Sequence, residues 1–148
     1  MEQVRTGALE GDELDASLLL LAELGLVAAT DPRFISTCNA IGRELCRNGR
    51  IMRYTNDDGF GAPETAFLVC NFRYIDALAA ICRLDEARAL CVDLLALRNA
   101  FGLLSEDIHP ETAALWGNIP QTYSMAGTVN SAMRLSVRWE DVWCLVSS

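Results

Sequence analysis

The chain has 148 residues, of which 51% are hydrophobic and 22% charged, a composition typical of one folded globular domain. Its formal net charge is -8, and all twelve basic residues are arginines that are spread singly along the sequence. Nucleic acids and anionic membrane surfaces repel an acidic protein that has no basic patch, so we expect neither as a partner.

The N-terminal residues lack the apolar core of a signal peptide, and the most apolar run, residues 14–29, is interrupted by Asp15 and Glu23. That run therefore predicts a core helix rather than a membrane span. The cysteines form no C-x-x-C pair and have no histidine partner at zinc spacing, so we expect buried reduced thiols in a cytoplasmic protein, without metal or cofactor. They are Cys38, Cys46, Cys70, Cys82, Cys91 and Cys144.

Three expected helices have the composition of buried elements. Residues 13–24 and 64–83 are apolar almost all round, which predicts burial on most sides. Residues 120 or 121 to 135 are small and uncharged as far as Met133, and they suit close packing against a neighbour.

Two further expected helices alternate with these and are amphipathic. Residues 31–46 begin with Asp31 as a cap before Pro32, and Asn48-Gly49 supplies a left-handed stop. Residues 85–101 carry an apolar stripe that ends at Phe101. We therefore predict an all-α fold of about five main helices.

Two long polar loops separate these helices, at residues 50–63, with an extended piece at 51–54, and at 101–124. If consecutive helices are antiparallel, as short connections favour, both loops emerge at the same end, before the second and third buried helices. This arrangement predicts an α/α toroid with one polar rim. The rim residues are Arg53, Tyr54, Asp57, Asp58, Glu64, Glu106, Asp107, Asn118 and Gln121.

Six ordered blocks then resemble the C-terminal portion of the catalytic domain of glycoside hydrolase family 15, the glucoamylases and bacterial trehalase-like enzymes. They are DASLLLL at 15–21, RY at 53–54 with DDG at 57–59, ETAFLVC at 64–70, LDEARAL at 84–90, GLLSED at 102–107 and GNIPQ at 117–121.

The resemblance implies a partial (α/α)6 toroid, an open arc of the ring, and hydrolysis of an α-glucoside such as trehalose or a malto-oligosaccharide with inversion. It places the general base at Glu106 and sugar contacts at Arg53 and Asp57. Asn118 and Gln121 share the rim by the loop argument, and Trp116 is a candidate for the pocket wall. The alternatives are a loop acid at Glu106, an Arg53–Asp57 salt bridge, and a packing role for Trp116.

The chain also departs from the family's pattern. No glutamate matches the family's general acid, and Arg73 and Met125 stand where the family usually has an aromatic residue and a histidine. We therefore expect one incomplete catalytic domain over residues 1–148, a fragment or truncated relative that is inactive alone, with residues 1–12 and 142–148 poorly ordered. A missing N-terminal half or a second copy could complete the ring. The alternative is a non-catalytic helical module that dimerises or completes a partner chain.

Overall fold

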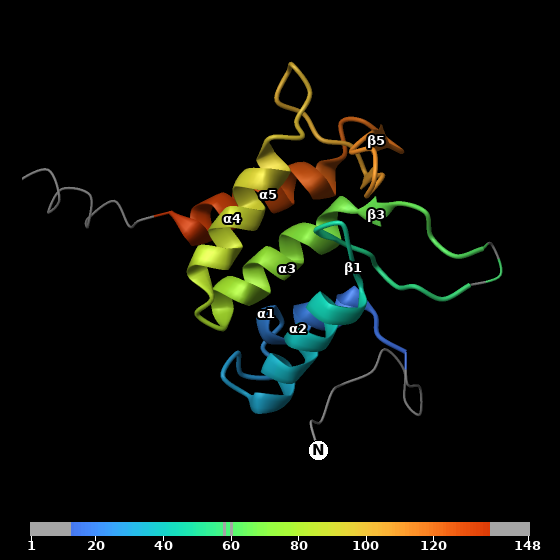
Figure 1. Ribbon diagram of the computed structural model, residues 1–148. Helices are drawn as coiled ribbons and strands as arrows, with labels where there is room; N and C mark the ends of the chain where they lie inside the picture. The colour runs from blue at the N-terminus through green and yellow to red at the C-terminus, as the bar shows by residue number, and fades with distance from the viewer. Residues whose placement is uncertain (1–12, 58, 60, 137–148) are drawn as a thin grey trace, which may run out of the picture.

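The computed structural model describes residues 13–57, 59 and 61–136, so the expectations for residues 1–12 and 142–148 lie outside the described residues. The described part contains a 3-10 helix, five α-helices and five two-residue strands (Figure 1). In chain order these are η1 (Ala16–Leu19), α1 (Leu20–Glu23), α2 (Pro32–Glu44), β1 (Cys46–Arg47), β2 (Arg50–Ile51), β3 (Ala66–Phe67), α3 (Leu68–Ala80), α4 (Leu84–Leu95), β4 (Asp107–Ile108), β5 (Leu115–Trp116) and α5 (Thr122–Leu135).

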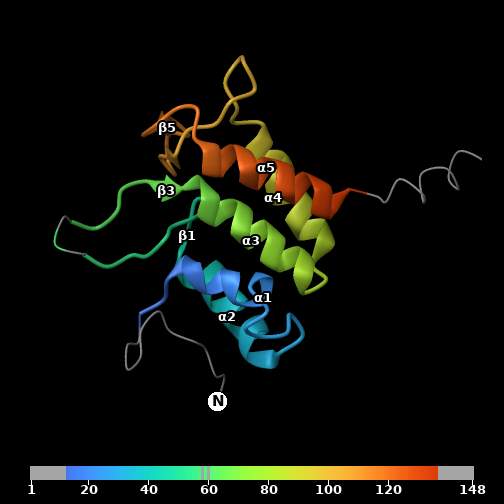
Figure 2. The ribbon, with the colours of Figure 1, turned by 180° about the vertical axis from the view of Figure 1, so that it is seen from behind.

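The helices form an arc of two layers with α3 at its centre. Helices α1, α3 and α5 lie side by side in one layer, and α2 and α4 cover them from the other side (Figures 1 and 2). Helix α3 contacts every other helix. The predicted alternation of inner and outer helices, and the all-α class, are thus confirmed.

Helix α3 is buried on nearly all sides, as its sequence predicts. Leu68, Phe72, Ile75 and Leu78 are almost completely shielded from solvent. The helix begins four residues later than the expected residue 64, because residues 66 and 67 pair with β4 instead of continuing the helix.

The first apolar segment does not form one buried helix. It consists of η1 and the single turn α1, which start where the Asp15 carboxylate accepts a hydrogen bond from the Ser17 N–H (2.7 Å). Ala16 and Leu19 are buried, whereas Leu24 is 65% exposed. The prediction of burial on most sides was wrong, because within the described residues only one side of the segment faces neighbouring helices.

Helix α5 packs closely along one line only. A Cβ added at Gly127 would lie 2.8 Å from the Phe72 side chain, so the α5 backbone packs directly against this side chain of α3. The Ser131 hydroxyl donates a hydrogen bond to Asp76 (2.8 Å) and ties α5 to α3. The remaining faces are open, and Met133 is 73% exposed, so the expectation of burial held for one face.

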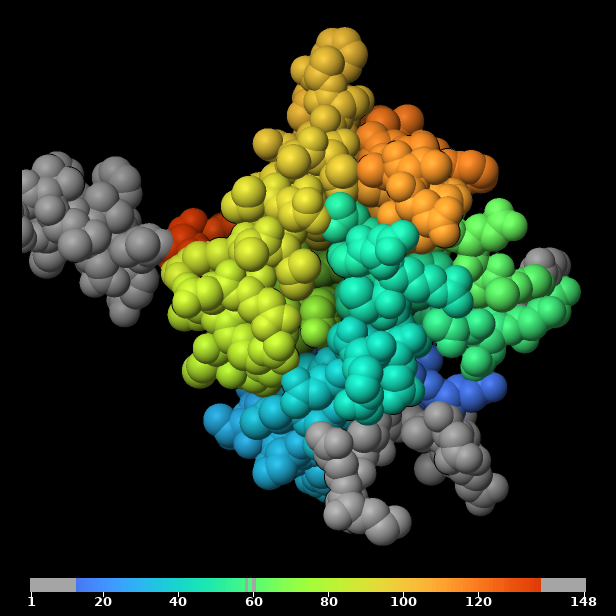
Figure 3. Space-filling model, viewed as in Figure 1, coloured from blue at the N-terminus to red at the C-terminus, as the bar shows by residue number. Residues whose placement is uncertain are grey.

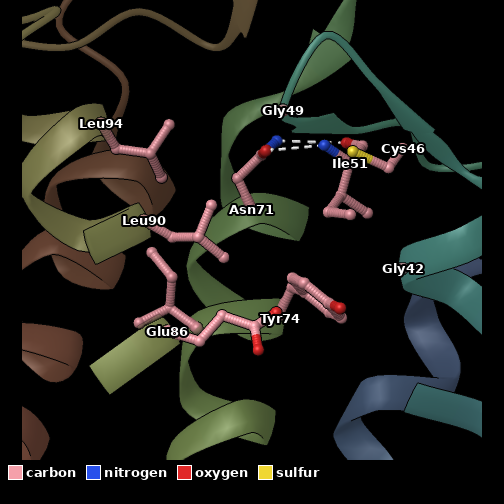
Figure 4. A pocket seen from close by; sticks show the side chains of 10 residues that line it. Gly42, Cys46, Gly49, Ile51, Asn71, Tyr74, Glu86, Leu90 and Leu94 are labelled. Carbon is pink, nitrogen blue, oxygen red and sulfur yellow. Dashed lines mark hydrogen bonds between the residues drawn. The ribbon is translucent and has the colours of Figure 1, made fainter. Parts of the chain in front are cut away.

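Helix α2 begins as predicted, with the Asp31 carboxylate accepting a hydrogen bond from the Arg33 N–H (2.8 Å). Asn48 and Gly49 both have positive φ, but they form the turn of the β1–β2 hairpin rather than a helix stop. Asn71 of α3 is 4% exposed and holds the hairpin through two hydrogen bonds to the Ile51 backbone (Figure 4). Figure 3 shows this hairpin lying against α4, where Arg50 of β2 forms an ion pair with Asp93.

Helix α4 ends at Leu95, six residues before the predicted end. The Asn99 side chain instead accepts hydrogen bonds from the N–H groups of Phe101 and Leu103, both at 2.9 Å, and this forms a turn. Phe101 is 85% exposed, so its assignment to the apolar stripe was wrong.

The cysteines of the described residues are all free thiols, but only three are buried. Cys38, Cys70 and Cys91 lie in the core, whereas Cys46 and Cys82 are exposed, which corrects the expectation for these two. Cys144 lies outside the described residues. Among the helices described, none has both the length and the apolarity that crossing a membrane requires.

Candidate active site

The two long loops meet in a three-stranded antiparallel sheet. Strand β3, at the end of the first loop, pairs with β4 in the second loop, and β4 pairs with β5. Ala66 and Ile108 are directly opposite each other and fully buried, so this face of the sheet joins the core. The predicted emergence of both loops at the same end of the arc is therefore confirmed.

Glu106 immediately precedes β4 and is held through its backbone on two sides. Its N–H donates to the Asn118 carbonyl, and its own carbonyl accepts from the Leu68 N–H at the start of α3, both at 2.9 Å. These bonds place the residue between the first turn of the central helix and the loop after β5. The position of its Cα is thus set by the fold rather than by the loop alone.

The Glu106 carboxylate is oriented by Asn118. Its Oε2 accepts a hydrogen bond of 2.7 Å from the Asn118 side-chain amide and a longer one of 3.4 Å from the Asn118 N–H. Gly117 permits this approach, since its φ is +76° and an added Cβ would lie 3.0 Å from Glu106 Cβ and 3.1 Å from Oε2. Within the part of the chain that the structure describes, Oε1 makes no hydrogen bond.

Glu106 opens onto a hollow of about 210 Å³ between the two loops. The first loop contributes Arg53, and the residue after Glu106, Asp107, also reaches the hollow. The described residues that line it are Arg53, Tyr54, Pro63, Thr65, Phe67, Glu106 and Asp107. The structure therefore brings together three of the predicted site residues: Arg53 and Glu106 line the hollow, and Asn118 is hydrogen-bonded to Glu106.

The two adjacent carboxylates have different environments. Asp107 accepts a hydrogen bond from the Thr65 hydroxyl (3.0 Å). Burial raises the pKa of Asp107 above its ordinary value; the nearby Glu106 charge acts in the same direction and the Thr65 hydrogen bond opposes it. Glu106 has its own donor in Asn118, so the two side chains point to separate partners.

Arg53 is anchored to the first inner segment rather than to its own loop. Its carbonyl accepts a hydrogen bond from the Ala16 N–H (2.8 Å), and its guanidinium lies 3.7 Å from the Asp15 carboxylate and 5.7 Å from the centre of the Tyr54 ring. The alternative of an Arg53–Asp57 salt bridge is wrong, because Arg53 pairs with Asp15.

The other three predicted site residues neither line this hollow nor bond to Glu106. Asp57 accepts hydrogen bonds from the N–H groups of Gly59 (2.8 Å) and Gly61 (3.0 Å) and so organises its own turn. Trp116 lies on β5, 52% exposed, with its ring 6.3 Å from that of His109. Gln121 precedes α5 and donates its N–H to the Leu104 carbonyl (3.1 Å).

The hollow also contains residues that were not predicted as site residues, chiefly Thr65 and Phe67. Phe67 lies opposite Asp107 in the β3–β4 pair, so the register brings it to the site. A strand of two residues is too short to show a periodic pattern in the sequence. Only the apolar run that precedes α3 could have indicated the β3–β4 pairing.

A different hollow, of about 130 Å³, lies on the outer side of the arc between α2 and α4 (Figure 4). It is bounded by Tyr74 and Asn71 of α3 and by Leu90 and Leu94 of α4. Asn71 already uses its side chain on Ile51, and the walls are mainly apolar. We therefore regard the Glu106 hollow as the candidate active site.

Solved structures with the same architecture define the class of this fold. A structure titled as a wild-type glycosidase aligns with 91% of this chain and 39% of its own chain, with a TM-score of 0.77 and 22% sequence identity. A variant of that glycosidase in complex with glucose aligns equally well. The fold is that of part of an (α/α)6 glycosidase ring.

Sequence comparison gives the family. The family model described as glycosyl hydrolases family 15 matches residues 4–133, and the chain belongs to this family. It is 41% identical over 123 residues to a trehalase of Thermoplasma acidophilum and 35% identical over 127 residues to a trehalase of Mycolicibacterium smegmatis. The matches cover 82% and 84% of this chain but 21% and 19% of the relatives, so the chain spans about a fifth of their length.

Proposed function

We propose that this chain carries the general-base side of an inverting α-glucoside hydrolase active site, with Glu106 as the base. The observation that supports this proposal is the fixed Glu106 carboxylate, which Asn118 orients through Oε2 while Oε1 has no partner among the described residues. A base of this kind must hold a water against the sugar and accept its proton. An oriented carboxylate with one available oxygen suits this role.

In the proposed reaction, water held by Glu106 Oε1 attacks the anomeric carbon and transfers a proton to the carboxylate. The bond to the leaving oxygen breaks as a separate acid protonates that oxygen from the other face of the sugar. Arg53 faces the same hollow, and we propose that its guanidinium donates hydrogen bonds to the hydroxyls of the bound glucose. Two further expected sugar contacts, Asp57 and Gln121, would need to turn toward the ligand from outside this hollow.

The acid requires a second carboxyl group about 6.5–9.5 Å from the base, across the sugar. Asp107 is the other carboxylate in the lining, but it follows Glu106 directly in the chain and is bonded to Thr65, so it cannot stand on the opposite face of a substrate. We propose that the acid comes from outside these 148 residues and that the chain alone does not turn over substrate.

The substrate class rests on the relatives. Trehalases are among the most similar proteins, and a structure with the same fold holds glucose. We therefore propose trehalose or a related α-glucoside as the ligand.

Titration of isotope-labelled chain with trehalose and with glucose, followed by NMR, tests this proposal. We expect amide shifts that cluster at Glu106, Asn118 and Arg53, and we expect Asn118→Ala to weaken them. The matched control is Glu111→Gln, an exposed acid of the same loop that lies outside the hollow, and it should bind like the parent chain. Binding that is unaffected by Asn118→Ala would contradict the proposed site.

Glucose release from trehalose and maltose tests the missing acid. We expect no release by the chain alone. Release that disappears in Glu106→Gln would show that the acid lies within these residues and would refute that part of the proposal.

One observation favours the alternative, a helical interaction module. Helix α5 exposes large apolar side chains, with Tyr123, Val129 and Met133 all more than half exposed. Light scattering separates the two functions: a discrete oligomer without saccharide binding supports the module, and a saccharide-binding monomer supports the glycosidase part.

A further inference from the structure

A second hollow, of about 190 Å³, adjoins the Glu106 hollow. The two share Arg53 and Phe67, so they form one continuous surface on the inner side of the arc. The second hollow is bounded by η1, α3 and the start of α5. Its lining is Ser17, Arg53, Phe67, Val69, Cys70, Arg73 and Tyr123.

Two arginines line this second hollow in an acidic protein. These are Arg53 and Arg73, although the chain as a whole has a net charge of -8; the carboxylates of Asp15 and Asp107 lie outside the described lining but close enough to act on it. Arg73 of α3 makes neither a hydrogen bond nor an ion pair with any residue in 13–57, 59 or 61–136, and Arg53 is only loosely paired with Asp15, at 3.7 Å. Both guanidiniums are therefore available to a ligand.

The two positive charges act on the same point of the hollow. Cys70 lies in its wall, and burial raises the pKa of this thiol to about 11; the charges of Arg73 and Arg53 lower this pKa, and those of Asp15 and Asp107 raise it. Arg73 and Arg53 come from segments 20 positions apart, so their convergence depends on the fold.

The remaining polar groups suit an anionic ligand. Ser17 and Tyr123 contribute hydroxyl groups that can donate hydrogen bonds. A guanidinium presents a planar fork of donors that matches the oxygens of a carboxylate or phosphate. Arg73, which has no ion pair with any described residue, can supply such a fork.

We propose that this second hollow receives an anionic substituent of the same sugar whose reacting end lies at Glu106. Within the α-glucosides proposed above, the ligand class is then narrowed from neutral trehalose to a related α-glucoside that carries a phosphate or a carboxylate. This inference rests on the proposed function, because it uses the Glu106 hollow as the site of the sugar ring. Arg73 is the residue that selects for the charge, and Arg53 contacts both parts of the ligand.

Calorimetric titration of the 148-residue chain at low salt tests this inference with glucose, glucose 6-phosphate, glucuronate and inorganic phosphate. We expect glucose 6-phosphate and glucuronate to bind about tenfold more tightly than glucose, as one charge-assisted hydrogen bond implies. Arg73→Met should remove this difference and leave glucose binding unchanged. The matched control is Arg88→Met, an exposed arginine of α4 next to Asp85, and it should retain the preference.

A second variant, Arg73→Lys, keeps the inference testable if Arg73→Met does not fold. Lysine retains the charge but lacks the planar fork of donors, so this variant should show an intermediate preference for the anionic sugars. Equal affinities for glucose and the anionic sugars would overturn the inference and leave the proposed function intact. Inorganic phosphate that binds as tightly as glucose 6-phosphate would also overturn it, because the anion would then be recognised without the sugar. Glucose that produces no binding signal would count against the proposed function itself.

Discussion

Replacing Gly117 with alanine should both destabilise the chain and displace the Glu106 carboxylate. Gly117 has a φ of +76°, a left-handed conformation that costs an alanine about 1–2 kcal/mol. The added Cβ would also lie 3.0 Å from Glu106 Cβ and 3.1 Å from its Oε2. Glu106 cannot retreat easily, because its backbone is bonded to Leu68 and Asn118. Overpacking of this kind costs about 1–3 kcal/mol, so the total loss should be about 2–5 kcal/mol.

Gly102→Ala separates these two contributions. Gly102 has nearly the same φ, +77°, but a Cβ added there would have no neighbouring atom within 4 Å. It should therefore lose only the backbone contribution of about 1–2 kcal/mol. The difference between the two variants measures the contact with Glu106.

Urea unfolding followed by circular dichroism gives both free energies by linear extrapolation. The NMR signal of the Asn118 side-chain amide, which donates to Glu106 over 2.7 Å, reports whether the carboxylate has moved. Equal destabilisation by the two variants, with an unchanged Asn118 signal in Gly117→Ala, would refute the proposed packing of Gly117 against Glu106.

Three further predictions concern the core and the thiols. Gly42→Ala should lower the free energy of unfolding by about 1–3 kcal/mol despite the better helix propensity of alanine, because the added Cβ would lie 2.1 Å from the Tyr74 hydroxyl. In urea unfolding, the double variant with Tyr74→Phe should regain part of the lost stability. A double variant as unstable as Gly42→Ala alone would contradict this contact. Burial raises the pKa of Asp76 above 3.8, so the stability that this group contributes is full below that value and is lost as pH rises through the raised pKa. Asp76→Asn should therefore weaken the pH dependence of the unfolding free energy measured in urea across this range. The same change of unfolding free energy with pH in the variant and the parent chain would contradict this prediction. Burial raises the pKa of Cys38 to about 12, so at pH 8 mass spectrometry should find it alkylated far more slowly than the exposed Cys46, and equal rates would refute this.

Local signals predicted the helices well. Asp31 before Pro32 marked the start of α2, and the connection lengths placed both long loops at one end of the arc. These features depend on neighbouring residues or on chain length alone, so a single sequence contains them. The apolar segment at 13–24 shows the limit, since apolar composition predicts burial but not which element covers each face.

The arrangement of the candidate site was harder to predict. Arg53 and Asp57 lie four residues apart in one polar loop, yet Arg53 reaches the Glu106 hollow and Asp57 caps its own turn. The difference depends on Asp15 and Ala16, which hold Arg53 from a distant segment. Such contacts between distant segments leave no local pattern, and the same is true of the β3–β4 pair.

The β3–β4 pair also determines when the candidate site exists during folding. Ala66 and Ile108 become neighbours only after the 41 residues between them, which include α3 and α4, have been brought into place. Closing so long a segment is a late and cooperative step, so a partly folded chain with formed helices would lack the hollow. A ligand that binds there would select the complete fold and raise the melting temperature of the whole chain, rather than stiffen one loop. Saccharide affinity and global stability should therefore rise and fall together in variants of this sheet.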